Sequence, residues 1–244
     1  MLLIKIKKMK TYRKIIILTA CILSAFTIFS YKKMEKTELF PKLSSYCSKL
    51  PDEFSQIPED RKEDLKAIAD FIAEKRNEHK PVNLLFVCTS NSRRSHMSQV
   101  WSQIASYYYG IDSVYTFSGG TEQTRVNINA INALTRTGIE IYSNNQGDNP
   151  LRYLKVGENI NPWVIFSKKY TDSTNPKSNF AAIMVCTESD QACPIVEGAD
   201  LRIGLPFQDP KEFDNSPLKD SKYDERCRQI AREMFYVMAL ASKK

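Results

Sequence analysis

Cysteine and histidine are scarce in this chain of 244 residues, and their positions exclude several kinds of protein. The 6 cysteines are too few and too irregularly spaced for a fold that depends on a disulfide framework. The 2 histidines and the cysteines show no spacing that is typical of a zinc site. No internal repeat or low-complexity tract is present, and the chain is short for two full domains. We therefore expect one globular domain without a metal or other cofactor.

Positive charge exceeds negative charge, but much of the excess lies near the N-terminus. The formal net charge is +7 and the isoelectric point is about 9.0. Six of the basic residues precede residue 15, namely Lys5, Lys7, Lys8, Lys10, Arg13 and Lys14. A cluster of this kind belongs to a terminal segment, so the net charge does not indicate a nucleic-acid partner.

An apolar run from Ile15 to Tyr31 follows these charges. Basic residues, an apolar stretch and then polar sequence are typical of a signal peptide, and about 17 apolar residues also suffice for a marginal membrane-spanning helix. The segment Leu18-Thr19-Ala20-Cys21 is similar to a bacterial lipobox, although apolar residues continue beyond the cysteine. Six basic residues before the run and three soon after it favour a cytoplasmic N-terminus, with the domain outside.

These features divide the chain into three predicted parts. Residues 1–33 form a signal peptide or membrane anchor, residues 34–80 a linker and N-terminal helical arm, and residues 81–244 the main domain. The domain is then exported, periplasmic or membrane-anchored in a bacterium. Translation from Met34 would delete the first segment and leave the protein in the cytoplasm.

The arm begins with residues 37–57, where several prolines among polar residues indicate a linker or irregular structure. From Glu59 to about Glu78, apolar residues recur at helical spacing and predict one helix that packs on the domain.

Strands and helices alternate through the rest of the chain. Residues 82–87 predict a strand buried on both faces, and residues 94–109 predict the helix that follows it. Further strands are expected at residues 113–118, 181–186 and 200–205, and further helices at residues 127–137 and 220–240. This order predicts a doubly wound α/β fold with a mainly four-stranded parallel sheet flanked by helices, and ligands bind such sheets at the carboxyl ends of the strands. Residues 144–180 have only short apolar runs, so we expect an insertion or lid there.

The segment Cys88-Thr89-Ser90-Asn91-Ser92-Arg93-Arg94-Ser95 carries the main chemical signal. Backbone N–H groups of a tight loop and of a first helical turn can bind the oxygens of a tetrahedral anion, and Arg94 adds a planar fork of donors. The same positive field favours a thiolate, so Cys88 is the expected nucleophile. The positions expected to bind the oxyanion are Thr89, Ser90, Asn91, Ser92, Arg93, Arg94 and Ser95.

This segment resembles the phosphate loop of the low-molecular-weight protein tyrosine phosphatase superfamily, which includes thioredoxin-coupled arsenate reductases. The resemblance runs from about Val82 to the C-terminal helix and includes residues 117–122, which are similar to the family's segment after its second strand. It implies that Asn91 holds the shape of the loop and that Ser95 hydrogen-bonds the thiolate. The late pair Asp209-Pro210 matches the family's general acid.

Two enzyme activities are compatible with the resemblance, and further cysteines distinguish them. Residues 186–194 resemble the reductase segment that carries the second and third redox cysteines. This similarity implies that Cys186 attacks Cys88, that Cys193 then attacks Cys186, and that a thioredoxin-like partner reduces the resulting disulfide. Our first hypothesis is therefore an arsenate reductase. The alternative is a low-molecular-weight protein tyrosine phosphatase that acts on a phosphate ester through a phosphocysteine at Cys88, with Asp209 as general acid.

Several positions depart from the family pattern. Arg93 replaces a usual loop cysteine, Gln99 replaces an acidic residue linked to a cation site, and Lys211-Glu212 replaces an aromatic pair that follows Asp-Pro in many of the phosphatases. These departures argue against potassium binding and weaken an assignment to phosphotyrosine.

A third hypothesis is a non-catalytic anion or redox sensor that keeps the loop without turnover. We expect Cys47 and Cys227 to be structural, and His96 to face solvent.

Overall fold

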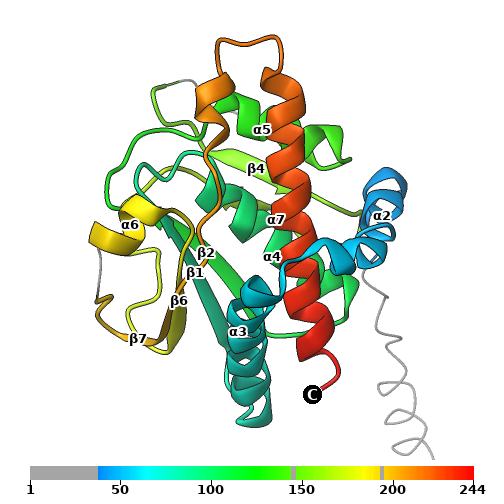
Figure 1. The fold of residues 1–244 in the computed structure, drawn as a ribbon, viewed down its shortest axis with the longest axis vertical. Coiled ribbons are helices and arrows are strands. Elements are labelled where there is room, and N and C mark those ends of the chain that lie inside the picture. Colours follow the sequence, from blue (N-terminus) through cyan, green and yellow to red (C-terminus); the bar gives the residue numbers. More distant parts are fainter. Residues whose placement is uncertain (1–37, 144–146, 193–194) are drawn as a thin grey trace, which may run out of the picture. The chain divides into compact units, whose positions relative to one another are not determined.

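Four parallel strands form the sheet that positions the loop after Cys88 (Figure 1). The computed structural model describes residues 38–143, 147–192 and 195–244. Across the sheet, the strands lie in the order β2 (Val114–Gly120), β1 (Val82–Cys88), β6 (Phe180–Met184) and β7 (Ala199–Gly204). Strand β1 pairs in parallel with β2 on one side and β6 on the other. Its carboxyl end therefore lies between those of two neighbouring strands.

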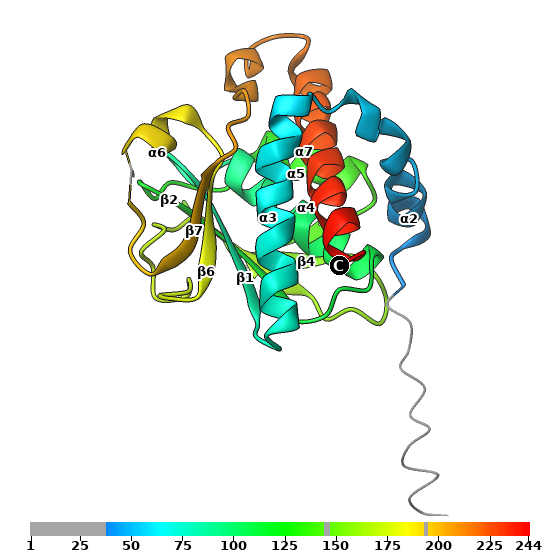
Figure 2. The same ribbon diagram turned by 60° about the horizontal axis from the view of Figure 1, so that its bottom comes forward.

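Helices α3, α4 and α7 gather on one side of this sheet (Figure 2). Helix α4 packs on β1 and β2, and α3 packs on β1 and β7. The long C-terminal helix α7 contacts α3, α4 and α5. The bounds of the helices in the domain are Glu59–Asn77 for α3, Arg94–Tyr108 for α4, Ile128–Arg136 for α5, Thr187–Ala192 for α6 and Lys219–Ala241 for α7.

Strand β1 is buried on both faces, as its apolar sequence predicted. Leu84, Phe86 and Cys88 belong to the main core beneath the helices, while Leu85 and Val87 belong to a smaller cluster on the other face. This alternation follows from the two-residue repeat of a strand. It directs Cys88 to the face on which α4 begins.

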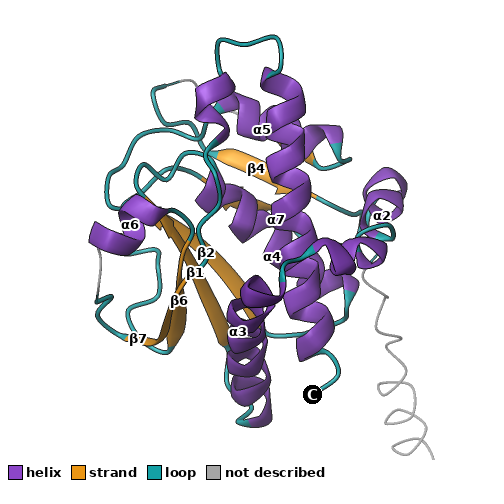
Figure 3. Ribbon diagram, in the orientation of Figure 1, coloured by secondary structure: helices purple, strands orange, loops and turns teal. Residues whose placement is uncertain are grey.

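The expected four-stranded parallel sheet with flanking helices is confirmed, and each predicted element begins and ends within two residues of the observed one. The two faces differ in their cover. The main core lies beneath α3, α4 and α7. The smaller cluster on the other face includes Val196, and the half-buried side chains of Phe117 and Tyr170 pack against it. The second face of the sheet is thus covered in part by irregular chain, as the teal segments of Figure 3 show.

The structure has a second, antiparallel sheet that the sequence did not predict, and two of its three strands lie within the expected insertion at residues 144–180. It consists of β3 (Glu140–Tyr142), β4 (Arg152–Lys155) and β5 (Trp163–Ile165). Leu154 and Ile165 are fully buried, and the exposed ring of Tyr142 stacks on Tyr153 with 5.4 Å between centroids. Strands of three or four residues show too few alternations to be recognised in a sequence.

We expected residues 37–57 to form a linker or irregular arm, but the described residues 38–57 are largely helical. They contain helix α2 (Pro41–Cys47) and the 3-10 helix η1 (Pro51–Gln56), each of which begins at a proline whose fixed φ suits a first helical turn. The side chains of Leu43, Cys47 and Leu50 are 0% exposed. Tyr46 stacks on Trp101 of α4 at 5.4 Å. These contacts make residues 37–244 one compact unit.

The predicted signal peptide or membrane anchor at residues 1–33 lies outside the described residues, as does Cys21. A search of the described ranges alone finds no helix with the length and apolar character that a membrane span requires.

Candidate active site

The loop of residues 89–93 connects the end of β1 to the start of α4. Strand β1 ends at Cys88, whose side chain is 4% exposed, and α4 begins at Arg94 without a side chain that caps its N-terminus. The structure therefore places the predicted nucleophile at the carboxyl end of a central strand and at the mouth of a helix. Unpaired N–H groups of a first helical turn favour a bound anion at this point.

The carbonyl oxygens of the loop point outward, because each accepts a hydrogen bond from a group that surrounds it. The pairs are Cys88 O with Thr121 N at 3.1 Å, Thr89 O with Glu122 N at 2.8 Å, Ser90 O with Thr124 Oγ1 at 2.7 Å, Asn91 O with His96 Nε2 at 2.9 Å and Ser92 O with Asn127 N at 2.9 Å. Within the described part of the chain, no backbone N–H of residues 89–93 donates a hydrogen bond. The loop thus has the donor arrangement of an anion cradle.

Asn91 holds the bend of the loop. Its φ of 42° lies in the left-handed region, which asparagine tolerates better than most residues. Its side-chain oxygen accepts a hydrogen bond from the backbone N of Lys168 at 2.8 Å, and its Nδ2 donates to Ser95 Oγ at 2.9 Å. Both the oxygen and the nitrogen of the Asn91 side-chain amide are therefore hydrogen-bonded, which fixes the orientation of the side chain.

The hydroxyl oxygen of Ser95 lies 3.0 Å from the sulfur of Cys88. Because Asn91 donates to this oxygen, the hydroxyl proton of Ser95 is free to point at the sulfur. A hydrogen bond of this kind stabilises a thiolate more than a thiol.

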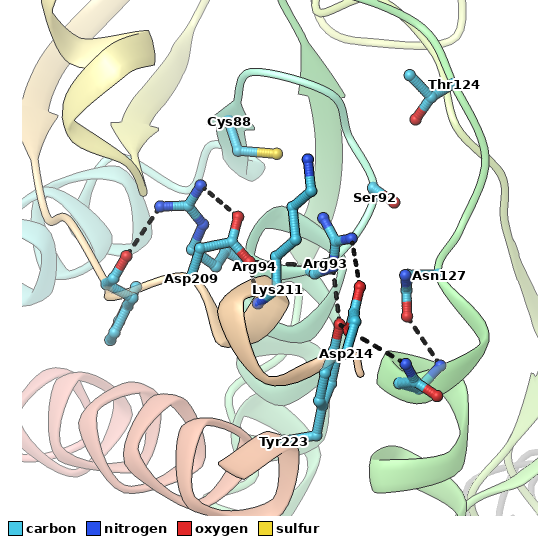
Figure 4. Close-up of polar contacts among 12 residues, drawn as sticks. Cys88, Ser92, Arg93, Arg94, Thr124, Asn127, Asp209, Lys211, Asp214 and Tyr223 are labelled. Atoms are coloured by element: carbon cyan, nitrogen blue, oxygen red, sulfur yellow. Dashed lines mark hydrogen bonds and ion pairs between the residues drawn. The ribbon is translucent and has the colours of Figure 1, made fainter. Parts of the chain in front are cut away.

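Arg94 is 9% exposed and its guanidinium is held in place by two acceptors. Nη1 donates to the carbonyl oxygen of Phe207 at 2.9 Å, and Nη2 donates to Asp209 at 2.8 Å. Cys88, Arg94 and Asp209 line the same cavity of about 620 Å³ (Figure 4). The structure therefore brings the predicted nucleophile, anion-binding arginine and general acid to one cavity.

Arg93, the other arginine of the loop, is anchored by α7 and by the segment before it. Its Nε donates to Tyr223 Oη at 2.8 Å, and Nη2 lies 3.3 Å from Asp214. Burial alone lowers the pKa of Arg93, but the charge of Asp209, the Tyr223 hydroxyl and Asp214 raise it overall. Burial has the opposite effect on a phenol and raises the pKa of Tyr223 to about 12. The Tyr223 hydroxyl therefore stays neutral and donates to Asp214.

His96 is fully buried, so the expectation that it faces solvent was wrong. Its Nε2 lies 2.9 Å from the Asn91 carbonyl oxygen and its Nδ1 lies 3.1 Å from Ser118 Oγ. Burial, together with the nearby charge of Lys168, lowers the pKa of His96 to about 3. The neutral ring therefore braces the loop as donor to Asn91 and acceptor from Ser118.

Cys186 follows the strand next to β1 and is 0% exposed. Its sulfur lies 3.5 Å from the hydroxyl oxygen of Thr89, the residue that follows Cys88. Adjacent parallel strands thus carry the first two cysteines of the predicted relay to the same end of the sheet. Cys193, the predicted third cysteine, lies outside the described residues.

Sequence reasoning missed three features of the site. Lys211 lines the Cys88 cavity, and Figure 4 shows its side chain extending from η2 (Pro210–Phe213) toward the space before the sulfur. Tyr223 and Asp214 anchor Arg93, although no local pattern marks them. Lys168 is 5% exposed behind the loop, its ammonium lies 4.5 Å from the Phe166 ring centroid, and burial lowers its pKa to about 8. Of these residues, only Lys211 could have been found from the sequence, because it stands two residues after the predicted general acid Asp209.

Comparisons with known proteins agree with the resemblance seen in the motifs. No protein-family model matches the chain. An arsenate reductase from Bacillus cereus strain ATCC 14579 is 26% identical over 151 residues, which are 61% of this chain and 93% of that protein. An arsenate reductase from Bacillus cereus strain 03BB102 is 25% identical over 150 residues, again 61% of this chain and 92% of the relative.

The solved structures that align with this chain include two phosphatases. A low molecular weight phosphotyrosine phosphatase from Vibrio cholerae O395 aligns with a TM-score of 0.43 at 13% identity, over 64% of this chain and 94% of that chain. The YwlE arginine phosphatase from Geobacillus stearothermophilus aligns with a TM-score of 0.42 at 14% identity, over 65% of this chain and 92% of that chain. The predicted resemblance is confirmed at the level of distant relatives, several of which are named arsenate reductase.

Proposed function

We propose that this protein is a thiol-dependent arsenate reductase with Cys88 as the nucleophile. The observation that carries the proposal is the contact of 3.5 Å between the Cys186 sulfur and the Thr89 hydroxyl, beside the oxyanion loop. A reductase needs a second thiol close enough to reach the first, and a phosphatase does not. The similarity to arsenate reductases from Bacillus cereus supports the same assignment.

In the first proposed step, the Cys88 thiolate attacks arsenic in arsenate bound by the loop amides and Arg94. A sulfur–arsenic bond forms, an arsenic–oxygen bond breaks, and the oxygen leaves as water after protonation. Arsenic remains pentavalent at this stage. The arginine and the N–H groups offset the negative charge of the oxyanion.

In the second step, the Cys186 thiolate attacks the Cys88 sulfur. A disulfide forms, the sulfur–arsenic bond breaks, and its electron pair stays on arsenic, which leaves as trivalent arsenite. Cys193 then attacks Cys186 and releases Cys88 as a thiolate. An external dithiol of the thioredoxin type reduces the Cys186–Cys193 disulfide and completes the cycle.

Cys186→Ser tests the relay directly. With arsenate and a thioredoxin system, we expect this variant to lose turnover, while Cys47→Ser, which also removes a buried thiol, keeps it. Mass spectrometry after a single turnover should find Cys88 linked to Cys186 in a Cys193→Ser variant. Full turnover by Cys186→Ser would refute the reductase proposal.

A second candidate function, phosphomonoester hydrolysis, is favoured by Asp209. This carboxylate lines the cavity that holds Cys88, and one of its oxygens accepts from Arg94 while the other caps the N-terminus of η2. It is therefore positioned to protonate a leaving oxygen, as the family resemblance implies. Asp209→Asn should abolish aryl phosphate hydrolysis while leaving the arsenate-driven disulfide relay in place. Binding of phosphate with no product in either assay would instead support the sensor hypothesis.

A further inference from the structure

The cavity that contains Cys88 adjoins a second cavity of about 600 Å³. The two share a wall formed by Ser90, Ser92, Arg93 and Lys211. The second cavity is also lined by residues 124–128, before and at the start of α5, and by Gly147, Asp148, Pro150 and Arg152, which lead into β4. A ligand held by its oxyanion in the loop can therefore extend over the shared wall into this second space.

Positive charge dominates the second cavity. The cations that line it are Arg93, Arg125, Arg152 and Lys211, and Asp148 is the single carboxylate among its lining residues. Arg93 is largely offset by Asp214, at 3.3 Å. In the described part of the chain, the side chains of Arg125, Arg152 and Lys211 form no ion pair. The cavity thus has more positive charge than its own carboxylate offsets.

Arg152 gives the strongest indication of an absent partner. Its Nε is buried and has no hydrogen-bond acceptor among the described residues. The residue begins β4, where pairing with Ile165 of β5 fixes its backbone. A buried N–H without an acceptor costs about 1–3 kcal/mol, and a small movement of the Arg152 side chain toward the cavity would let an anionic ligand accept from it.

The wall beside these cations is apolar. Ile128 lines the cavity and is 54% exposed, and Val126 lies next to it. An aromatic ring or short hydrocarbon segment between two anionic groups would cover the exposed Ile128 side chain.

We propose that the second cavity is a subsite for a distal anionic group, so that the preferred organic ligand is a phosphomonoester with a carboxylate or phosphate on its leaving group. The reacting phosphate enters the Cys88 loop, the apolar spacer lies on Ile128, and the distal anion lies near Arg125 and Arg152. This assignment rests on oxyanion binding by the loop and extends the phosphatase candidate to a substrate class. Lys211, between the two cavities, contributes to both anionic positions.

Competitive binding to the full-length protein tests the subsite. The probes are inorganic phosphate, 3- and 4-carboxyphenyl phosphate, and the corresponding carbamoylphenyl phosphates, in which a neutral amide replaces the carboxylate at nearly the same size. Cys88→Ser prevents turnover during the measurement. We expect at least one carboxylate to bind about fivefold more tightly than its amide, with a preference that weakens as salt is added.

Substitution of the two arginines assigns the preference to this cavity. Arg125→Gln combined with Arg152→Gln should bring the carboxylate-to-amide ratio of affinities close to one. Arg136→Gln removes one positive charge from the far end of α5, outside the cavity, and should keep the ratio, as a control for each single substitution.

The outcomes separate this proposal from the proposed function. Equal affinity for carboxylate and amide, or a preference that survives in the double variant, overturns the subsite while binding of phosphate still supports the oxyanion loop. Failure of every probe to bind, phosphate included, overturns both.

Discussion

Nε2 of His96 lies 2.9 Å from the carbonyl oxygen of Asn91, which ties the first turn of α4 to the bend of the oxyanion loop. Because this carbonyl points away from the centre of the loop, the neighbouring backbone N–H groups point toward the centre, where an anion would bind. Burial keeps His96 neutral by lowering its pKa, so that Nε2 donates to Asn91 while the unprotonated Nδ1 accepts from Ser118.

This relationship predicts how stability depends on pH. The pKa of His96 is about 3 in the folded protein, below its ordinary value of 6.5, so the unfolded chain binds the proton more readily. Stability is then present above pH 6.5 and is lost as the pH falls toward 3. Between pH 7 and pH 5 this one group should remove about 2 kcal/mol from the free energy of unfolding.

Urea unfolding at several pH values measures this loss, and the comparison of variants isolates it. His96→Gln should lose less stability than the wild type between pH 7 and pH 5, because the amide does not titrate. His79→Asn is the control, because His79 is exposed and its φ of 55° suits asparagine. If His96→Gln keeps the full pH dependence of the wild type, the assignment to His96 is wrong.

Ser95→Ala should slow the reaction of Cys88 with iodoacetamide at pH 7 by about fivefold, because the thiolate loses a hydrogen bond worth about 1 kcal/mol. Mass spectrometry of the alkylated peptide distinguishes Cys88 from the other cysteines. Ser98→Ala is a matched control, since its buried hydroxyl donates to the carbonyl oxygen of Arg94 and not to the sulfur. An equal effect of both substitutions would indicate general loosening of α4.

Arg94→Lys should weaken arsenate and phosphate binding by about tenfold or more. An ammonium cannot bind Phe207 O and Asp209 simultaneously in the geometry of a guanidinium and still face the anion. Calorimetric titration with phosphate measures the change, and Arg136→Lys, in an exposed contact with Asp224, serves as control. Unchanged affinity in Arg94→Lys would remove Arg94 from the anion site.

Gly120→Ala should damage both the fold and the anion site. A Cβ at this position would lie 2.6 Å from the Thr89 carbonyl oxygen and 2.7 Å from the Asn91 backbone nitrogen. The backbone of Gly120 cannot yield easily, because its N–H donates to Lys168 O and its carbonyl accepts from Tyr170 N, each at 2.9 Å. We expect a loss of about 1–3 kcal/mol in stability together with weaker phosphate binding.

Gly110→Ala is the companion experiment, because a Cβ there meets open space while the φ of 64° disfavours alanine. It should cost about 1–2 kcal/mol of stability without altering phosphate affinity. Thermal unfolding and phosphate titration of both variants separate strain in the fold from distortion of the loop. Normal phosphate affinity in a folded Gly120→Ala protein would contradict the close packing.

Local sequence determined the elements that carry the chemistry. The apolar run before Cys88, the short polar loop and the helical spacing after Arg94 each depend on neighbouring residues, so the strand, loop and helix could be predicted with nearly correct bounds. The two-residue repeat of a strand also assigned Cys88 to a definite position at its end. The predicted export segment at residues 1–33 stays a prediction.

Only the tertiary structure decided which distant residues meet this loop. The short strands around Arg152 and Trp163 form because chain segments pair across space, and their three or four residues are too few to show a period. Burial of His96, the anchoring of Arg93 by Tyr223, and the approach of Cys186 to Thr89 likewise depend on packing between separate elements. Such contacts arise from the assembly of the whole core, and no local window of sequence contains them.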